Sequence, residues 1–409
     1  MRAAYNSRRF QVKESAMQSR KTRDVLVIGA GACGCTTAYF LALEGCSVAL
    51  LDKGAVGREA SWASAGMVGA ESCPQRDPWF RSATDLSRRL YDRLDDELFD
   101  RTGRRIGYGG EGHLVIARDP DEVPVLRERI DTQTAGGIEA RMLGAEEARE
   151  REPQLPPDVV AAGWMPGGRY LDARSFTATV AVAAAQAGAR IHEGHPVGAL
   201  IRDGDRIVGV RSGHESFHAA VVVNACGAWS GGIDTELTLP VYPMHGQIMA
   251  IAGRPGGLRH NVSRAGAIGY ATPRSEGRVV VGATHDDWGF VKKRTPEGIS
   301  FLGSIVQHLM PIMAESPVLD IWSGLRPTSP DSLPTIGPDH RASGGYLWAA
   351  GHAASGMMQM PATAQVVTDL VMGRAPALPI DQLSSARYVT DDHDTSGPRR
   401  SQFMSVENA

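Results

Sequence analysis

The feature that most constrains the fold of this chain is a glycine-rich segment between two short apolar runs. The first run, 24–28, leads into the motif Gly29-Ala30-Gly31-Ala32-Cys33-Gly34, and the second run, 47–51, ends in Asp52. Between them, 32–44 has the apolar spacing of a helix. A strand, a turn, a helix and a second strand within about 30 residues form the crossover unit of a parallel sheet. The pattern therefore predicts a doubly wound α/β domain.

The G-x-G-x-x-G motif also predicts a dinucleotide site. Gly29 would make the tight turn, Gly31 would let the backbone approach a pyrophosphate, and Gly34 would allow the helix to pack on the strand. The helix N-terminus adds partial positive charge beside the phosphates. Asp52 closes the second strand, where its carboxylate can accept a hydrogen bond from a ribose hydroxyl. A glycine-rich turn with a purely structural role is the alternative interpretation.

Later segments predict that a second domain interrupts this one. Short apolar runs at 220–224 and 346–350 are typical of buried strands that rejoin the first sheet. A long helix over 76–103 precedes them, and strands alternate with glycine turns over 241–283. We therefore expect a discontinuous Rossmann-type nucleotide-binding domain with an inserted antiparallel-sheet substrate domain. The expected division is 24–72, 145–238 and 324–388 for the first domain, 73–144 and 239–323 for the second, and disordered ends at 1–23 and 389–409.

Composition excludes several classes of protein. The formal net charge is -3, which favours neither nucleic acid nor an anionic membrane as a partner. No apolar run reaches the roughly 18 residues of a membrane span. Residues 1–23 lack the apolar core of a secretory signal, although a transit peptide or a true start at Met17 are further interpretations of this basic segment. The five scattered cysteines give neither a disulfide framework nor metal-ligand spacing, so we expect a cytoplasmic protein without a metal.

The segment after Asp52 carries the most specific motif. The stretch 57–67, Gly-Arg-Glu-Ala-Ser-Trp-Ala-Ser-Ala-Gly-Met, resembles the second flavin motif of the glycine oxidase and D-amino acid oxidase family. The resemblance extends from residue 24 to about residue 373, and its motifs follow one another in the same order as in the family. It includes the segments 168–172, 196–197, 222–230, 270–274, 281–284, 324–328 and 351–356.

This resemblance implies FAD as the cofactor, bound without a covalent link. Relatives that link their flavin use a cysteine in the C-terminal half, and no cysteine follows Cys226 here. The family more often has glutamate where Asp52 stands, but the shorter carboxylate can still reach a ribose. By resemblance, the cofactor-binding residues are Gly29, Gly31, Ala32, Cys33, Gly34, Asp52, Lys53, Ala60, Ser61, Ala65, Gly66, Met67, Val197, His352, Ala353, Ala354, Ser355, Gly356, Met357 and Met358.

The resemblance also indicates where an amino acid would bind. Arg326 matches an arginine that pairs with the substrate carboxylate, since a planar guanidinium can bind both carboxylate oxygens. Tyr270 matches a tyrosine that hydrogen-bonds this carboxylate or caps the pocket. Their structural alternatives are an arginine bonded to loop carbonyls and a half-buried strand tyrosine. His245 is a third candidate to face the pocket, with a packed histidine as its alternative. Ala354 stands where glycine oxidases carry a second arginine, which removes a charge and leaves more room.

We therefore expect an FAD-dependent oxidase that takes a hydride from the Cα of glycine or a small D-amino acid. Orientation and electrostatics suffice for this step without a separate base. The imine would give a 2-oxo acid and ammonia, oxygen would give hydrogen peroxide, and thiamine biosynthesis is the pathway associated with the family. One alternative is a dehydrogenase for amino acids or secondary amines that passes electrons to a quinone or a partner subunit. A flavin-binding scaffold is another, and the resemblance is compatible with a homo-oligomer.

Overall fold

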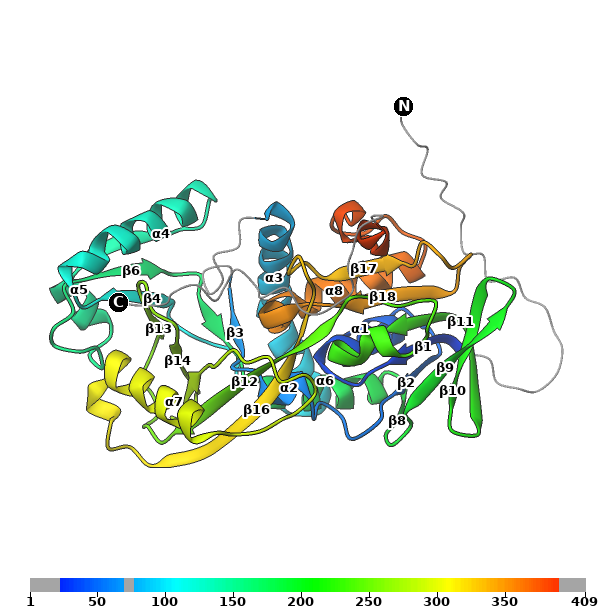
Figure 1. Ribbon diagram of the computed structural model, residues 1–409, viewed down its shortest axis with the longest axis horizontal. Coiled ribbons are helices and arrows are strands. Elements are labelled where there is room, and N and C mark those ends of the chain that lie inside the picture. The colour runs from blue at the N-terminus through cyan, green and yellow to red at the C-terminus, as the bar shows by residue number, and fades with distance from the viewer. Residues whose placement is uncertain (1–22, 70–76, 390–409) are drawn as a thin grey trace.

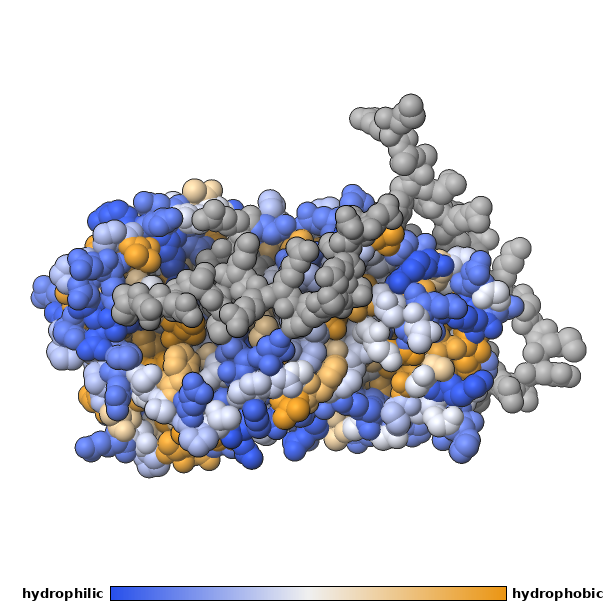
Figure 2. Space-filling view, in the orientation of Figure 1, coloured by the Kyte–Doolittle hydropathy of each residue, from blue (hydrophilic) through white to orange (hydrophobic). Residues whose placement is uncertain are grey.

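The computed structural model describes residues 23–69 and 77–389 and builds them around two eight-stranded sheets. Figure 1 shows the sheets at opposite ends of an elongated molecule, and the strands β12 (Tyr242–Ile251) and β16 (Val318–Thr328) run through the middle. The face in Figure 2 is mostly hydrophilic, with apolar residues in separate groups. Apart from Arg23 and Val389, the expected disordered ends lie outside the described residues. Within the described ranges no helix has the length and apolar character of a membrane span.

The first sheet has the parallel core that the glycine motif predicts. β1 (Arg23–Ile28) pairs in parallel with both β2 (Val48–Leu51) and β11 (Glu215–Asn224). β11 also pairs in parallel with β18 (Tyr346–Ala350), so the runs 220–224 and 346–350 rejoin this sheet as expected. The other members of this sheet are β8 (Arg190–His192), β9 (Val197–Asp203), β10 (Arg206–Ser212) and β17 (Thr335–Pro338).

Both faces of this sheet are covered, which explains its continuous apolar strands. Val25 and Val27 belong to a core shared with the helices, whereas Leu26 and Ile28 belong to the core beneath the β9–β10 hairpin. This alternation follows from the two-residue period of a strand. The helices are α1 (Ala32–Leu43), α3 (Pro78–Thr102), α6 (Ala173–Gln186) and α8 (Gly356–Val371).

The second sheet is antiparallel except for one parallel pair, β4 with β13. α7 (Pro296–Leu309) packs its apolar face on it. Several elements depart from the expected division. β6 (161–165) pairs with β4 here rather than with the first sheet, and residues 324–328 of β16 pair with β12 of the second sheet. α3, expected in the second domain, packs with the helices of the first. Gly163 of β6 leaves room for Ile130 of α4 (Val123–Ala135), and this long-range packing has no local signal. The sheet runs β16, β12, β15 (Val279–Gly282), β14 (Tyr270–Pro273), β13 (Asn261–Arg264), β4 (His113–Ala117), β6 (Ala161–Met165) and β5 (Arg141–Gly144).

A buried arginine joins the two sheets. The guanidinium of Arg274, 4% exposed, donates through Nη1 to the Pro273 carbonyl at 2.8 Å and through Nη2 to the Ala65 carbonyl. Its Nε lies 3.8 Å from Oδ2 of Asp172, a carboxylate that also caps α6 through the Ser175 backbone N–H at 2.8 Å. Burial lowers the pKa of Arg274 to about 10, so it stays a cation at neutral pH. Arg274 therefore fastens β14 to the loop that contains Ala65.

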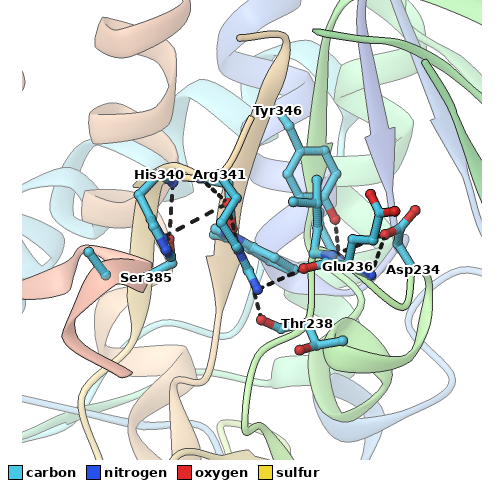
Figure 3. A network of polar contacts seen from close by, with 12 residues as sticks. Asp234, Glu236, Thr238, His340, Arg341, Tyr346 and Ser385 are labelled. Atoms are coloured by element: carbon cyan, nitrogen blue, oxygen red, sulfur yellow. Dashed lines mark hydrogen bonds and ion pairs between the residues drawn. The ribbon is translucent and has the colours of Figure 1, made fainter. Parts of the chain in front are cut away.

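A second polar network holds the segment 233–239 against the first sheet (Figure 3). Arg341 donates to both oxygens of the buried Asp339 carboxylate at 3.0 and 2.7 Å, and to the carbonyls of Glu236 and Thr238 at 2.8 Å each. Trp348 of β18 donates its indole N–H to the same carboxylate at 2.7 Å. The buried charge is thus paired and hydrogen-bonded. The network fixes a segment that lines the cavity described next.

Candidate active site

A cavity of about 840 Å³ opens where the two sheets meet. The carboxyl ends of β1 and β2 line one end of it. Strands β12, β14 and β16 line the other, together with Ala283 just past β15. The segment 59–67, which includes α2 (Ala60–Ala63) and the start of β3 (Met67–Val68), forms part of the wall between these ends. Ligands of open α/β sheets bind outside the carboxyl ends of the parallel strands, so this is the candidate active site.

The glycine turn takes the conformation that its motif predicts. Gly29 has φ of +99°, and an added Cβ would lie 2.5 Å from the Ala225 carbonyl oxygen. A Cβ at Gly34 would lie 1.8 Å from the Gly29 carbonyl oxygen, which shows how closely α1 packs on the turn. Gly31 is the N-cap of α1 and lines the cavity, and the first turn of this helix has no acidic residue. The turn therefore presents backbone and a positive helix terminus to an anion.

Asp52 supports the glycine turn from the end of β2. Its Oδ2 accepts a hydrogen bond from the Ala30 N–H at 2.6 Å, and its Oδ1 accepts one from the Gly54 N–H at 2.8 Å. Burial raises the pKa of this carboxyl, and the two backbone hydrogen bonds act against that rise. Asp52 lines the cavity, so a role toward a ribose hydroxyl stays a prediction that this geometry accommodates.

Small residues and close backbone contacts form the wall expected beneath a flavin. Ser61 Oγ accepts from the Ala32 N–H at 2.8 Å and so ties this wall to α1. Gly66 has φ of +67°, and a Cβ there would lie 2.0 Å from the Leu171 carbonyl oxygen. A Cβ at Gly324 of β16 would lie 2.3 Å from Cβ of Ala63. The wall is therefore held by contacts that leave no space for larger side chains.

Most of the predicted cofactor residues line this one cavity, and Gly34 and Ser355 are the two that do not. The 352–358 segment closes the cavity beside α8. His352 is buried and its Nε2 lies 3.0 Å from Oγ1 of Thr363. Burial lowers the pKa of His352 to about 3, so this ring is neutral at pH 7. A neutral, hydrogen-bonded imidazole fits a packing role at this end of α8.

Arg326 and Tyr270 come together at the far end of the cavity. Both line it, Arg326 from β16 and Tyr270 from β14 of the same sheet, with β12 and β15 between these two strands. Nη1 of Arg326 donates to the carbonyls of His245 and Thr284 at 3.2 Å each, and within the described residues no carboxylate lies within 4.0 Å of the guanidinium. Burial lowers the pKa of Arg326 and raises that of Tyr270, and the Arg326 charge opposes the rise at Tyr270. A half-buried cation with no carboxylate partner among the described residues is suited to an anionic ligand.

His245 does not face the cavity, contrary to one of our expectations. Its ring is fully buried, with Nδ1 3.1 Å from Oδ2 of Asp286 and Nε2 3.0 Å from the Lys293 carbonyl oxygen, and it packs on Trp288. The reason is strand alternation, since the next residue of β12, Gly246, is the one that lines the cavity.

His285 and Phe290 are among the cavity residues that sequence reasoning missed. His285 follows β15 and lines the cavity near Arg326, and burial together with the Arg326 charge lowers its pKa to about 4. Its ring is therefore neutral at pH 7. Phe290 packs on Trp229 with ring centroids 5.2 Å apart. His285 follows the matched segment 281–284 directly, so that match was a signal that could have indicated it.

The fold and this site define an FAD-dependent oxidoreductase. Residues 24–370 match the DAO family, described as FAD dependent oxidoreductase, and the chain belongs to that family. It is 32% identical over 369 residues to the glycine oxidase of Geobacillus kaustophilus, covering 90% of this chain and 97% of the relative. The crystal structure of glycine oxidase from that organism covers 90% of this chain and 100% of its own, with a TM-score of 0.85 and 30% identity. The crystal structure of iminodiacetate oxidase from Chelativorans sp. BNC1 covers 88% of this chain and 98% of its own, with a TM-score of 0.79 and 28% identity.

The described residues fit FAD along the whole cavity. The glycine turn and the N-terminus of α1 suit the pyrophosphate, and the small-residue wall at 60–67 and the 352–358 segment suit the flavin. The family is FAD-dependent, and the chain is accordingly an FAD-dependent amino acid oxidoreductase. Both sheets contribute residues to this one cavity.

We expect the FAD to be released intact when the protein is denatured. No cysteine follows Cys226, and burial raises the pKa of the Cys226 thiol, which disfavours the reactive thiolate. Precipitation with acid should leave a yellow supernatant with the absorbance of free FAD. A colourless supernatant over a yellow pellet would show a covalent link.

Proposed function

We propose that this protein oxidises a small amino acid, glycine or a D-amino acid, at its Cα–N bond. The observation that carries the proposal is Arg326, which lies beside Tyr270 at the end of a cavity that fits FAD. Its guanidinium is largely shielded from solvent, and among the described residues it has no carboxylate partner. Bound FAD would accept the Cα hydride. Relatives of known structure carry the names glycine oxidase and iminodiacetate oxidase, which supports a small amino acid or a secondary amine as substrate.

The residues of the chain would act by binding and orientation. Arg326 would pair with the carboxylate and thereby fix which face of Cα meets the flavin. The Tyr270 hydroxyl would donate a hydrogen bond to the same carboxylate, since the raised pKa of Tyr270 keeps its proton in place. The neutral His285 ring adds no second charge near this end, so the pocket suits a monocarboxylate.

The net reaction also gives the fate of the product. Loss of the Cα hydride and of the amine proton leaves an imine, and water converts the imine into a 2-oxo acid and ammonia. With oxygen as the acceptor, the two electrons and two protons appear as hydrogen peroxide. A quinone or a partner subunit as acceptor would give the same imine without peroxide.

The test is flavin reduction under argon. The purified yellow protein should lose its flavin absorbance band when mixed with glycine, D-alanine or sarcosine, and air should restore the band. If none of a panel of small amino acids and secondary amines reduces the flavin, the proposed function is wrong. Peroxide equal to the imine formed would identify an oxidase, whereas reoxidation only by an added quinone would identify a dehydrogenase.

A further inference from the structure

The two side chains expected to meet the substrate both lie over glycines of neighbouring strands. A Cβ built on Gly282 of β15 would lie 2.5 Å from the Tyr270 hydroxyl oxygen. A Cβ built on Gly246 of β12 would lie 2.3 Å from Nη1 of Arg326, 2.6 Å from Nη2 and 2.7 Å from Cζ. Arg326 pairs with Met244 across the ladder, so its side chain reaches along β12 to rest on the bare backbone at Gly246.

The hydrogen bonds of Arg326 leave one defined edge of its guanidinium free. An arginine has five N–H groups, one on Nε and two on each Nη. Nη1 donates to the His245 and Thr284 carbonyls at 3.2 Å each, which uses both of its hydrogens. Over the described residues, neither Nε nor Nη2 has a hydrogen-bond partner. The Nε–Nη2 edge is therefore the fork available to a carboxylate.

A polar cluster behind β12 holds the two accepting carbonyls in place. Asp286 Oδ2 accepts from the Thr284 hydroxyl at 2.6 Å and lies 3.1 Å from His245 Nδ1. The backbones of His245 and Asp286 exchange hydrogen bonds of 2.9 and 3.0 Å. His245, which we expected in the cavity, thus acts from the opposite side of its strand.

We propose that these features form an arginine seat, made of Gly246 and the carbonyls of His245 and Thr284. The seat aims the Nε–Nη2 fork of Arg326 at the substrate carboxylate, and this inference rests on the proposed function. Gly246 is a positioning residue in this scheme. A side chain there would push the guanidinium away and misdirect the fork, while the flexible arginine could move without disturbing the sheet.

The decisive variant is Gly246→Ala. The φ of Gly246 lies outside the left-handed region, so alanine fits its backbone. The three atoms nearest to the added Cβ all belong to the guanidinium of Arg326. The readout is the Kd of glycolate, a carboxylate without an amine, measured from the change it causes in the flavin spectrum. We expect this Kd to rise roughly tenfold to hundredfold, as for the loss of hydrogen bonds to a charged group. FAD content and Tm should match those of the parent.

Gly303→Ala is the matched control, because a Cβ on Gly303 of α7 meets nothing within 4 Å. This variant should bind glycolate like the parent. A second pair tests the cluster itself: Asp286→Ala should weaken glycolate binding, and Asp286→Asn, which keeps one accepting oxygen, should recover part of the loss.

The outcomes separate this inference from the proposed function. A Gly246→Ala protein that binds glycolate within about twofold of the parent would overturn the seat. If Gly246→Ala does not accumulate as a flavoprotein, the two Asp286 variants provide the test. Glycolate binding in Asp286→Ala equal to that of the unmodified protein would then overturn the proposed arginine seat. The arginine seat would also be overturned if amino acids reduce the flavin of the unmodified protein but the protein binds no glycolate. Failure of every amino acid to reduce the parent would instead refute the proposed function, while glycolate binding would still report on the seat.

Discussion

Arg326→Ala is expected to keep its fold and its FAD while losing turnover of amino acids. In the parent, the substrate carboxylate would enter a buried site whose cation has no protein anion within 4.0 Å in the described part of the chain. Removing one member of a buried ion pair costs about 3–5 kcal/mol. This corresponds to a fall of roughly two to four decades in kcat/KM, measured from initial rates across substrate concentrations. Arg326→Lys should recover only part of the loss, because an ammonium cannot form the bidentate fork.

An amine without a carboxylate serves as the internal control for Arg326→Ala. Such an amine does not use the fork, so its reaction with the flavin should change much less than that of an amino acid. Near-parental rates with amino acids would show that the carboxylate anchor lies elsewhere. An insoluble, flavin-free protein would identify Arg326 as structural, since its Nη1 also joins β12 and the 284 segment.

Gly31→Val is expected to give folded protein without FAD. Gly31 is the N-cap of α1, and an added Cβ would already lie 3.2 Å from Oγ of Ser61, so the branched methyl groups would occupy the space where phosphates approach. The flavin absorbance per protein of the purified variant should fall to near zero. Gly198→Val is the matched control, because Gly198 is exposed on β9 and a Cβ there meets nothing within 4 Å. If Gly31→Val keeps its full flavin content, the glycine turn is not part of the cofactor site.

The parts of the fold that sequence predicted are those set by local patterns. The turn at Gly29, the parallel strands and α3 follow from glycine conformation, apolar runs and a capped amphipathic helix that starts after Asp77 and ends at Gly103. The cofactor residues came from a resemblance whose segments also follow short local motifs. The pairing of β6 with the second sheet depends on packing with α4, far away in sequence, and no local pattern encodes it.

Side-chain direction explains the misses at the site. His245 and Gly246 are adjacent on β12, and only the strand's register decides which of the two faces the cavity. His285 lies just past the end of β15, where the strand period no longer predicts direction. The free fork of Arg326 could not be predicted at all, because it depends on carbonyls from two other segments.

Arg274 links the wall expected beneath the flavin to the strand that begins with Tyr270. Its guanidinium donates to the Ala65 carbonyl in the flavin wall and to the carbonyl of Pro273, in the strand that begins with Tyr270. A ligand that orders one of these segments lowers the entropic cost of ordering the other, and linkage makes the effect reciprocal. Through this link, we expect bound FAD to tighten the binding of a carboxylate and a bound carboxylate to tighten the binding of FAD.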